Sequence, residues 1–342
     1  NNEANVVFIW DADGDRFNIV TIASVDDAMA AKEIGLEVEP LDSDRSCVYF
    51  KPNQIYFMLT AVKLEALAAS GDLGQYNWII ATTYPTSRSI GELALSFNNR
   101  YKTNLKTFQA PVGFKYFGDF VHEIETKLIG DNNDVTLTDV IGEKHNLGRT
   151  PRILIMAEES GGASMGTAGF YASAKGFRKS LALKEKDGMQ IGVMAIALAA
   201  RLKGEGKSFA GFYREKIEEN NIVYCHYNRT DVTLFDESLR GEARINAEAL
   251  GNERKEKIVR FFKSLTLLSP DAAHEQIRNR VDIILPSIKS LYWAGDGSYI
   301  DFGDTWFGLR ASGTDAVLRY YIEGKERSRI DMLAVALMHV RI

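Results

Sequence analysis

The stretch Val6-Val7-Phe8-Ile9-Trp10-Asp11-Ala12-Asp13-Gly14-Asp15-Arg16 joins an apolar run to three alternating aspartates. The apolar run predicts a β-strand, and Gly14 lets the loop after it turn tightly. Alternate residues of an extended loop point the same way, so the three carboxylates are expected to converge. Like charges this close are costly unless a cation neutralises them, and oxygen ligands favour a hard ion. We therefore predict that Asp11, Asp13 and Asp15 bind Mg²⁺.

Arg16 follows this cluster directly, where its guanidinium suits a phosphate shared with the metal. A solvated acidic turn is the structural alternative. An EF-hand is excluded, because its sixth and twelfth loop positions require Gly and Glu and are here Arg16 and Ile22. A dehalogenase-type phosphatase with Asp11 as its nucleophile remains an alternative. It normally has Thr or Val where this chain has Asp15, and residues 130–134 approach its late acidic motif one residue short.

Strand and helix patterns alternate along the first 220 residues and give way to short strands from residue 221 onward. The predicted fold class is α/β, with two α/β/α mixed-sheet domains, the first incomplete, followed by a smaller α+β C-terminal domain with an antiparallel sheet. Strands are expected at residues 6–10, 78–83, 153–157, 223–227, 281–285, 291–294, 299–302 and 317–322. Helices are expected at residues 25–31, 54–69, 87–97, 189–202, 253–265 and 331–340, with a loop at residues 108–117.

Three domains are predicted, at residues 1–75, 76–220 and 221–342. The first boundary rests on the glycines at positions 71 and 74. Because the chain begins Asn1-Asn2-Glu3 without methionine and runs directly into a strand, we expect it to start inside a domain. Ligands of open α/β sheets bind at the carboxyl ends of strands, and both acidic loops fall at such ends.

The second candidate loop is Glu158-Glu159-Ser160-Gly161-Gly162, directly after the strand at residues 153–157. Its carboxylate and hydroxyl, with glycines that allow close approach, suit recognition of vicinal sugar hydroxyls. We assign Glu158 and Ser160 to substrate binding. A polar loop in which Ser160 is only a helix cap is an equally weighted alternative.

The third candidate loop is Arg310-Ala311-Ser312-Gly313-Thr314-Asp315, followed by Arg319. A guanidinium, two hydroxyls and glycine N–H groups form a cradle for a phosphate. Arg310, Ser312, Gly313, Thr314 and Arg319 are therefore candidate phosphate ligands, with a solvated hairpin turn as the alternative.

Lys115 lies in Pro111-Val112-Gly113-Phe114-Lys115, a glycine-containing segment expected to turn. Lysine is a common surface residue, so this segment is weak evidence by itself. The five histidines show no metal-ligand spacing.

The composition of the 342 residues is that of an ordinary globular protein, with 45% hydrophobic and 25% charged residues. A net charge of −5 argues against a nucleic-acid partner, which needs clustered Lys and Arg. No stretch reaches the roughly 18 apolar residues that span a bilayer, so no membrane partner is expected. Cys47 and Cys225 are far apart and indicate reduced thiols in the cytoplasm.

The order and spacing of these loops resemble the α-D-phosphohexomutases, four-domain enzymes that include phosphoglucomutases and phosphomannomutases. Asp11–Arg16 resembles the metal loop of the family's second domain. Pro111–Lys115 and Glu158–Gly161 resemble segments of its third domain, and Lys186-Asp187-Gly188 resembles the segment that follows. Arg310–Thr314 and Arg319 resemble the phosphate loop of the fourth. The resemblance covers nearly the whole chain.

The resemblance implies magnesium-dependent phosphoryl transfer on a hexose phosphate, through a phosphoserine and a hexose bisphosphate. Arg16 and Lys115 would be catalytic, and Mg²⁺ would bind Asp11, Asp13 and Asp15. Glu158 and Ser160 would hold the sugar. Arg310, Ser312, Gly313, Thr314 and Arg319 would anchor the phosphate that does not react.

Three departures from the family pattern bear on this expectation. The Ser-His-Asn-Pro-type loop with the nucleophile is absent, since no Ser-His pair occurs in the chain. Gly162 stands where many bacterial members have histidine, and Asp315-Ala316 stands where the family usually has Glu-Pro. We therefore expect the first domain to be missing and this chain alone to be inactive. A non-catalytic sugar-phosphate-binding protein remains a further alternative.

Overall fold

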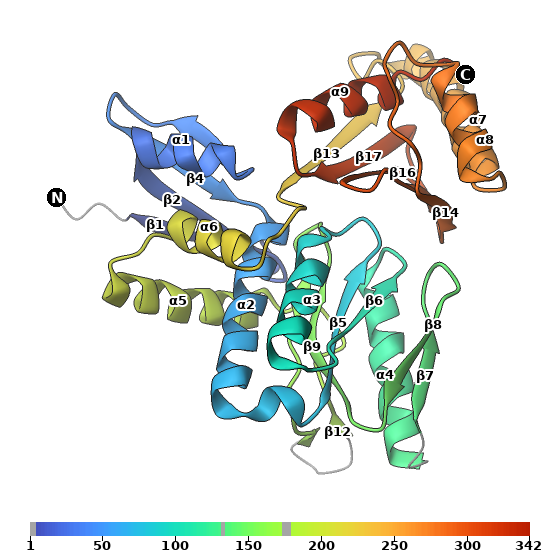
Figure 1. The fold of residues 1–342 in the computed structure, drawn as a ribbon. Coiled ribbons are helices and arrows are strands. Elements are labelled where there is room, and N and C mark those ends of the chain that lie inside the picture. The colour runs from blue at the N-terminus through green and yellow to red at the C-terminus, as the bar shows by residue number, and fades with distance from the viewer. Residues whose placement is uncertain (1–4, 131–133, 173–178) are drawn as a thin grey trace. The chain divides into compact units, whose positions relative to one another are not determined.

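The computed structural model of the chain describes residues 5–130, 134–172 and 179–342. These residues form two compact units, Asn1–Val223 and Tyr224–Ile342 (Figure 1). The fold class predicted from the sequence is confirmed: helices accompany several sheets, and the C-terminal sheet is antiparallel. Asn1-Asn2-Glu3 and most of the acidic segment at residues 130–134 lie outside the described residues.

The first sheet of the N-terminal unit is antiparallel in the order β1-β2-β4-β3. Its strands are β1 (Val6–Trp10), β2 (Phe17–Ser24), β4 (Arg45–Phe50) and β3 (Glu37–Pro40). Alternation along β2 buries Phe17 and Ile19, and Ile19 pairs with the buried Phe50 of β4. Helix α1 (Val25–Glu33) follows β2, and the Ser24 side chain caps it by accepting from the backbone N–H of Asp27.

The second sheet has the order β10-β9-β5-β6. Strands β6 (Lys106–Ala110) and β9 (Pro151–Ala157) run parallel to β5 (Asn77–Thr83), whereas β10 (Ala163–Ser164) is antiparallel to β9. Near-continuous burial of β5 and β9 is typical of strands covered on both faces. Other elements of this region are α3 (Ser89–Tyr101), α4 (Phe114–Gly130), β7 (Val135–Thr138), β8 (Lys144–Gly148), β11 (Tyr171–Ala172) and β12 (Lys179–Ser180).

Helix α2 (Pro52–Ser70) packs against both sheets of this unit, through β2 and β9 (Figure 1). Its first half is buried on every side, from Asn53 to Ala61. A short 3₁₀ turn (Asp72–Gly74) follows it. Helices α5 (Gly188–Glu205) and α6 (Phe209–Glu219) pack against each other and against α2. Asp187 caps α5, accepting from the backbone N–H of Gln190.

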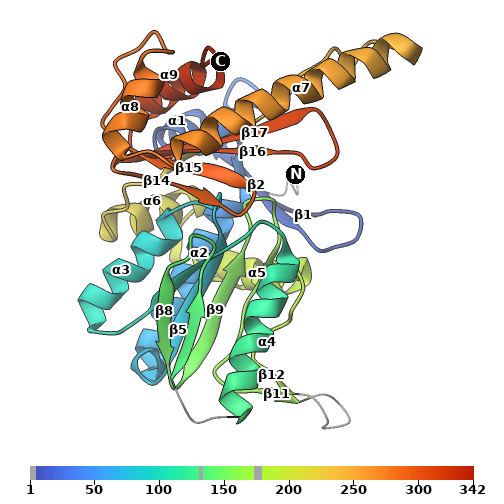
Figure 2. The ribbon, with the colours of Figure 1, turned by 90° about the vertical axis from the view of Figure 1, so that its right-hand side faces the viewer.

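The C-terminal unit is one antiparallel sheet in the order β13-β17-β16-β15-β14. Helices α7, α8 and α9 share a core with one face of this sheet, centred on Phe262, Phe307 and Leu333 (Figure 2). Tyr299, Trp306 and Tyr321 form a separate aromatic cluster. The bounds are β13 (His226–Thr233), α7 (Gly241–Leu265), α8 (Pro270–Arg278), β14 (Ser290–Ala294), β15 (Gly297–Asp301), β16 (Thr305–Ala311), β17 (Val317–Gly324) and α9 (Arg327–Met338).

Several sequence-based expectations for these elements are wrong. Residues 281–285 are not a strand: Val281 and Ile283 reach the core from irregular chain. The predicted strand at residues 223–227 begins only at His226, and residues 108–117 are partly β6 and α4 rather than a loop. The helix expected at residues 87–97 is α3, which begins at Ser89 with Arg88 as its N-cap. Strands β2, β3, β4, β7, β8, β10, β11, β12 and β16 and helices α4, α6 and α8 were not anticipated.

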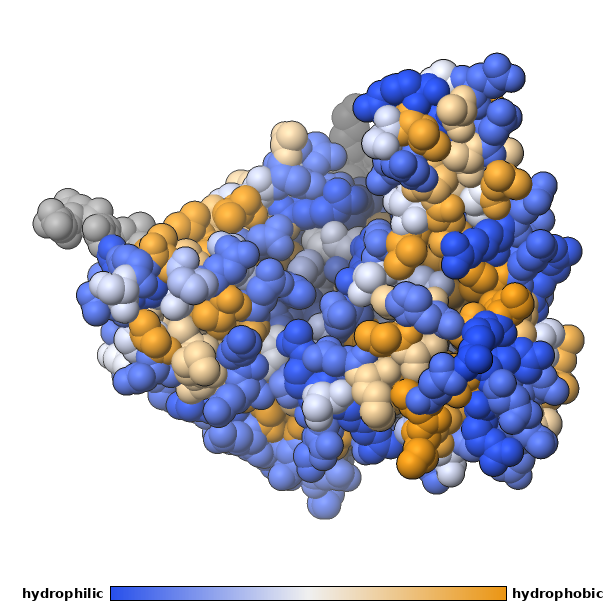
Figure 3. All heavy atoms as spheres, turned by 90° about the horizontal axis from the view of Figure 1, so that it is seen from above, coloured by the Kyte–Doolittle hydropathy of each residue, from blue (hydrophilic) through white to orange (hydrophobic). Residues whose placement is uncertain are grey.

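Large apolar side chains lie mainly in the interior of each unit. On the face drawn in Figure 3, apolar residues form small groups among hydrophilic ones. Within the described residues, every helix is too short or too polar to cross a bilayer.

Candidate functional site

The acidic loop Asp11–Arg16 closes the hairpin between β1 and β2. It follows the carboxyl end of β1, as predicted, but the sheet is antiparallel there. Gly14 takes a φ of 74°, and its N–H donates to the Asp11 carbonyl over 3.1 Å, which tightens the turn. One carboxylate oxygen from each of Asp11, Asp13 and Asp15 lies within 4.8 Å of the other two. The hairpin thus brings together the three predicted metal ligands.

Two cations of the chain lie against this cluster. The Arg16 backbone N–H donates to Asp11 Oδ1 over 3.0 Å, and its guanidinium lies 3.4 Å from Asp11 Oδ2. The backbone hydrogen bond from Arg16 is the main reason that the pKa of Asp11 is lowered. Lys186 Nζ lies 2.7 Å from Asp15 Oδ2, whereas the buried Asp15 Oδ1 has no hydrogen-bond partner. One buried carboxylate oxygen of the cluster is therefore left without a hydrogen bond.

These residues fit a hard divalent cation. The donor set consists of carboxylate oxygens from three residues, which suits Mg²⁺. The orphaned Asp15 Oδ1 is a further indication, because buried polar atoms normally have a partner.

The loop Glu158–Gly162 follows β9 at the carboxyl end of the parallel sheet. Glu158 accepts from the Gly113 N–H over 3.0 Å and from Ser160 Oγ over 3.2 Å. Burial is the main cause that raises the pKa of Glu158, and the neighbouring Glu159 adds to it. The carboxyl of Glu158 is thus fixed in position by the chain around it.

The acidic loop and the Glu158 loop touch each other directly. Arg16 and Gly162 form an isolated antiparallel bridge. Gly161 takes a φ of 109°, and a Cβ added there would lie 3.2 Å from Arg16 Cδ. At Gly162, an added Cβ would lie only 2.4 Å from Lys186 Cδ. Glycine at these positions allows Arg16 and Lys186 to pack over the second loop.

The start of helix α5 closes the same junction. A Cβ on Gly188 would lie 2.5 Å from the Gly14 carbonyl oxygen, so the helix contacts the acidic loop without a side chain between them. Trp10 Nε1 donates to the Gly188 carbonyl over 2.9 Å, and its ring fills the space beside Gly192. The Asp187 N–H donates to the Ala163 carbonyl over 2.8 Å. The segment Lys186-Asp187-Gly188 therefore belongs to the site.

Lys115 lies in the first turn of α4 rather than on an open turn, and its side chain is exposed. Its Nζ lies 4.9 Å from the centroid of the Tyr116 ring. The segment before it reaches the site through Gly113, whose N–H donates to Glu158. Lys115 is thus attached to the junction by its backbone neighbours.

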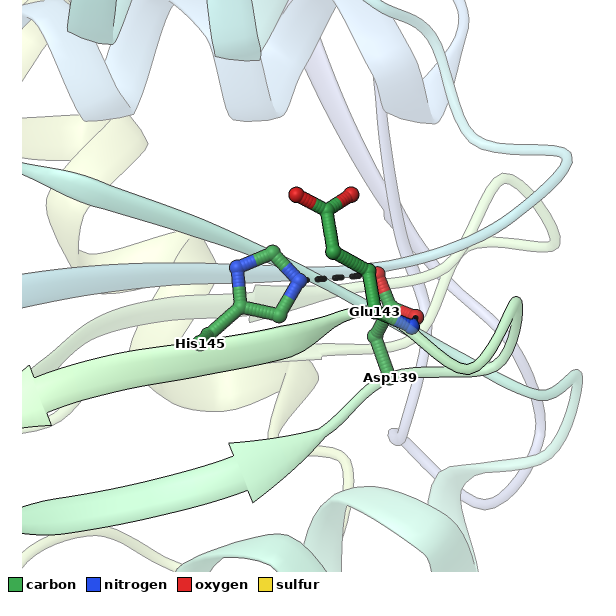
Figure 4. Close-up of side chains that lie close together, drawn as sticks. All are labelled: Asp139, Glu143 and His145. Atoms are coloured by element: carbon green, nitrogen blue, oxygen red, sulfur yellow. Dashed lines mark hydrogen bonds and ion pairs between the residues drawn. The ribbon is translucent and has the colours of Figure 1, made fainter.

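Asp139, Glu143 and His145 form a second group with three candidate metal-ligand atoms within 4.8 Å of one another (Figure 4). Here the groups have structural partners. His145 Nε2 and Asp139 Oδ2 share a hydrogen bond of 2.8 Å, and Asp139 Oδ1 accepts from the N–H groups of Ile141 and Glu143. This arrangement closes the β7–β8 hairpin, so we assign it no ligand.

The predicted phosphate loop forms the β16–β17 turn of the C-terminal unit. Arg310 pairs with Arg319 across the two strands. Arg310 Nε lies 2.5 Å from Asp296 Oδ2, and Arg319 Nε lies 3.5 Å from Asp231 Oδ2 and makes no hydrogen bond. Two arginines thus lie side by side at this turn.

The hydroxyls of the turn converge on one carboxylate. Thr314 Oγ1 donates to Asp315 Oδ2 over 2.7 Å and Ser312 Oγ over 3.3 Å, and the first bond is the main cause that lowers the pKa of Asp315. Lys255 of α7 donates to the carbonyls of Ser312 and Asp315. Gly313 has no atom within 4 Å of an added Cβ, so it leaves the turn open.

The structure therefore joins six predicted residues in the N-terminal unit and five in the C-terminal unit. Lys186, Asp296 and Lys255 were missed as site residues. Only Lys186 had a sequence signal, the Lys-Asp-Gly segment. In the N-terminal unit the predicted residues that meet are Asp11, Asp13, Asp15, Arg16, Glu158 and Ser160, with Lys115 attached through Gly113. In the C-terminal unit they are Arg310, Ser312, Gly313, Thr314 and Arg319.

Comparison with known proteins places one part of the chain in a family. Residues 275–340, which include the whole of the Arg310 turn, match the phosphoglucomutase/phosphomannomutase C-terminal domain. This segment belongs to the phosphoglucomutase/phosphomannomutase family. The family resemblance inferred from the sequence motifs is thereby confirmed for residues 275–340. No curated protein matches the chain.

Solved structures of phosphohexomutases are similar to the chain at low identity. A Thermus thermophilus protein assigned as a phosphomannomutase is 16% identical over 98% of this chain and 46% of its own, with a TM-score of 0.48. A phosphoglucomutase/phosphomannomutase family protein from Burkholderia thailandensis is 14% identical over 98% and 46%, with a TM-score of 0.42. An Aspergillus fumigatus N-acetylphosphoglucosamine mutase, solved with GlcNAc-6P and magnesium, is 12% identical over 98% and 52%, with a TM-score of 0.46. The chain spans about half the length of these structures.

Proposed function

We propose that this chain is the metal-binding, sugar-binding and phosphate-binding part of a magnesium-dependent phosphohexomutase of the cytoplasm. The observation that carries the proposal is the junction of the Asp11–Arg16 loop with the Glu158 loop, closed by Gly188 of α5. The proposed metal ligands and the proposed sugar ligands meet there, as phosphoryl transfer to a sugar hydroxyl would require. The family match at residues 275–340 supports it independently.

Asp11, Asp13 and Asp15 would hold Mg²⁺, which would neutralise charge on a phosphoryl group in transfer. Arg16 and Lys186, whose cationic groups lie beside the carboxylates, would bind the oxygens of that group. Lys115, at the start of α4, would contribute a further positive charge. These three cations would orient the phosphoryl group and offset its negative charge.

Glu158 and Ser160 would bind hydroxyls of the hexose. Because Glu158 already accepts from Gly113 and Ser160, its carboxyl is oriented before the sugar arrives. Its raised pKa reflects a buried environment, in which hydrogen bonds to a sugar would be strengthened.

Arg310, Ser312, Gly313, Thr314 and Arg319 would anchor the phosphate that does not react. Ser312 and Thr314 now donate to Asp315, so a phosphate would replace that carboxylate as their acceptor. The Arg319 Nε atom, buried without a hydrogen bond, would gain a partner. A hexose phosphate and a hexose bisphosphate are accordingly the proposed ligands.

The nucleophile would come from a serine loop outside this sequence, because no Ser-His pair occurs in it. The proposed division is residues 1–75 as the remainder of the metal-binding domain, 76–220 as the sugar-binding domain and 221–342 as the phosphate-binding domain.

The metal site is tested by titrating Mn²⁺ into the chain and following its electron paramagnetic resonance signal. We expect one bound ion in the wild type and none in the triple variant Asp11→Asn, Asp13→Asn, Asp15→Asn. Glu143→Gln, in the second carboxylate group, is the matched control and should bind as the wild type does. Binding that survives the triple variant but is lost on Glu143→Gln would refute the assignment.

A further inference from the structure

Glu159 is a buried carboxylate that the proposed mechanism does not use. It lies between Glu158 and Ser160, the two proposed sugar ligands, and is only 9% exposed. Its Oε2 atom accepts a hydrogen bond from Thr83 Oγ1 over 3.2 Å. A buried carboxylate is costly unless the chain binds it, so this contact indicates that the side chain is held in place for a purpose.

The groups that hold Glu159 lie at the carboxyl end of β5. Thr83 is the last residue of this strand, and the Thr86 N–H donates to the Thr83 carbonyl over 2.9 Å, which closes a tight turn. Both side chains are buried, and their hydroxyl oxygens lie 2.8 Å apart. Because β5 runs parallel to β9, this turn lies beside the start of the Glu158 loop.

The two hydroxyls and Glu159 form a closed ring of hydrogen bonds. The Glu159 N–H donates to Thr86 Oγ1 over 3.2 Å, and Thr83 Oγ1 donates to Glu159 Oε2. Thr86 Oγ1 has two acceptors within reach, Thr83 Oγ1 at 2.8 Å and the Ala157 carbonyl at 3.4 Å. When it donates to the nearer one, each of the three residues in the ring donates once and accepts once. The ring thus fixes both the backbone and the side chain of Glu159.

The two adjacent carboxylates are thereby directed to different elements. The Glu159 carboxyl accepts from Thr83, at the end of β5. The Glu158 carboxyl accepts from the Gly113 N–H, just before α4, and from Ser160 Oγ. Two neighbouring carboxylates repel each other, so separate partners are needed to hold both in one buried loop.

We propose that Thr83 and Thr86 are positioning residues for sugar binding. Their hydroxyls hold Glu159 at the end of β5, and the loop fixed in this way presents Glu158 and Ser160 to the hexose. Networks in which every member is satisfied make a buried site rigid, which preserves its geometry before the ligand arrives. This inference rests on the proposed function, because it requires that Glu158 and Ser160 bind the sugar.

Thr86→Val tests the inference, because it removes one hydroxyl of the ring and keeps the branched side chain. The probes are glucose 1-phosphate, mannose 1-phosphate and inorganic phosphate, since the gain in affinity over inorganic phosphate reports the sugar contacts. For the hexose phosphate that the wild type binds more tightly, we expect the dissociation constant to rise about tenfold, the scale of one hydrogen bond. The affinity for inorganic phosphate should not change.

Two further variants separate positioning from a general effect on the fold. Thr86→Ser keeps the hydroxyl and should bind the hexose phosphate as the wild type does. Thr60→Val is the matched control, since it removes a buried hydroxyl of α2 that has no hydrogen-bond partner among the described residues. It should leave all three affinities unchanged. A purely structural role for Thr86 would lower the urea midpoint of Thr86→Val and leave the affinity of the folded protein unchanged.

Thr83→Val breaks the ring at its other hydroxyl and replaces Thr86→Val if that variant does not fold. Unchanged hexose phosphate affinity in a folded ring variant overturns this inference alone. Failure of both valine variants to fold would assign the ring to the fold as a whole and overturn a role specific to the sugar loop. A wild-type chain that binds neither hexose phosphate more tightly than inorganic phosphate overturns the proposed sugar site, and the inference with it.

Discussion

Arg310 and Arg319 lie opposite each other on β16 and β17, where two like charges ordinarily destabilise a sheet. Asp296 and Asp231 offset this repulsion from the two sides. An anion that binds at the turn would relieve the repulsion further. The pair therefore favours a phosphate at this turn over an ordinary solvated hairpin.

Arg310→Ala should weaken hexose bisphosphate binding by about 2–4 kcal/mol, the scale for removing one partner of a buried charge pair. Ser312→Ala should cost nearer ~1 kcal/mol, as for one neutral hydrogen bond. Arg310→Lys should restore binding only in part, because an ammonium lacks the planar fork of a guanidinium. Calorimetric titration of the four proteins measures these differences. Unchanged binding in Arg310→Ala would identify the turn as a structural hairpin.

The sequence predicted residues whose chemistry is encoded within a few positions, such as the alternating aspartates and the Arg310 turn. It did not predict the ion pair between Lys186 and Asp15, because the two residues are far apart in the sequence. The same holds for Asp296 on Arg310, which depends on the pairing of β15 with β16. Contacts made by tertiary packing leave no local pattern.

Helix α5 reaches the acidic loop because glycines replace side chains on its packed face. Gly192→Ala should destabilise the protein by about 1–3 kcal/mol, since its Cβ would lie 2.3 Å from the Trp10 ring. Gly204→Ala, in the same helix with nothing within 4 Å, should stabilise it by about 0.5–1 kcal/mol. Urea unfolding of both variants provides the comparison. Equal effects would show that α5 does not depend on the contact with Trp10.

Helix α2 is fixed to the second sheet by Lys63, whose ammonium donates to the carbonyls of Leu154 and Gly166 over 2.9 and 2.6 Å. Burial lowers the pKa of Lys63 to about 8. The folded protein thus releases this proton at a lower pH than the unfolded chain, whose lysines titrate near ~10.4. The contribution of Lys63 to the free energy of unfolding should therefore rise between about pH 8 and pH 10.4, by up to about 3 kcal/mol.

The measurement is the difference in unfolding free energy between wild type and Lys63→Met across that range. Subtraction of the variant removes the contribution of other titrating groups. A difference that stays constant from neutral to alkaline pH would contradict the effect assigned to Lys63.

The helices expected at residues 25–31 and 189–202 and the strand expected at residues 153–157 are confirmed by α1, α5 and β9. The strand expected at residues 281–285 was wrong because apolar residues that fill a core look alike in regular and irregular chain. The antiparallel order of the first sheet was also missed. That order depends on the hairpin at Asp11–Arg16. Its polar residues were interpreted as a metal-binding loop, and the turn between two paired strands was not recognised.

At the scale of the whole molecule, the fold class followed from the alternation of strands and helices. The division into Asn1–Val223 and Tyr224–Ile342 reflects separate hydrophobic cores. The sequence alone does not show which apolar residues pack in the same core. The boundary at residue 75 remains a prediction, since both sheets before Val223 pack on α2.

The chain alone should not turn over glucose 1-phosphate or mannose 1-phosphate, because it supplies no serine in a Ser-His loop. A coupled assay with Mg²⁺ and a hexose bisphosphate tests this expectation. Turnover above ~1 s⁻¹, within the ordinary range of enzymes, would mean that another residue is the nucleophile. Activity that appears only when a serine-bearing domain is added would support the proposed division of roles.

The ion pair between Lys186 and Asp15 has a consequence for how the protein tolerates chelators. Lys186, from the segment before α5, supplies the acidic hairpin with a counter-charge, so removal of the proposed ion should not drive the aspartates apart. Binding of the proposed magnesium ion would then replace the Lys186 ammonium at a loop whose conformation does not change. Removal of the metal by a chelator should consequently abolish ligand binding at the site and leave the surrounding fold intact. Adding the metal back should restore ligand binding without refolding of the chain.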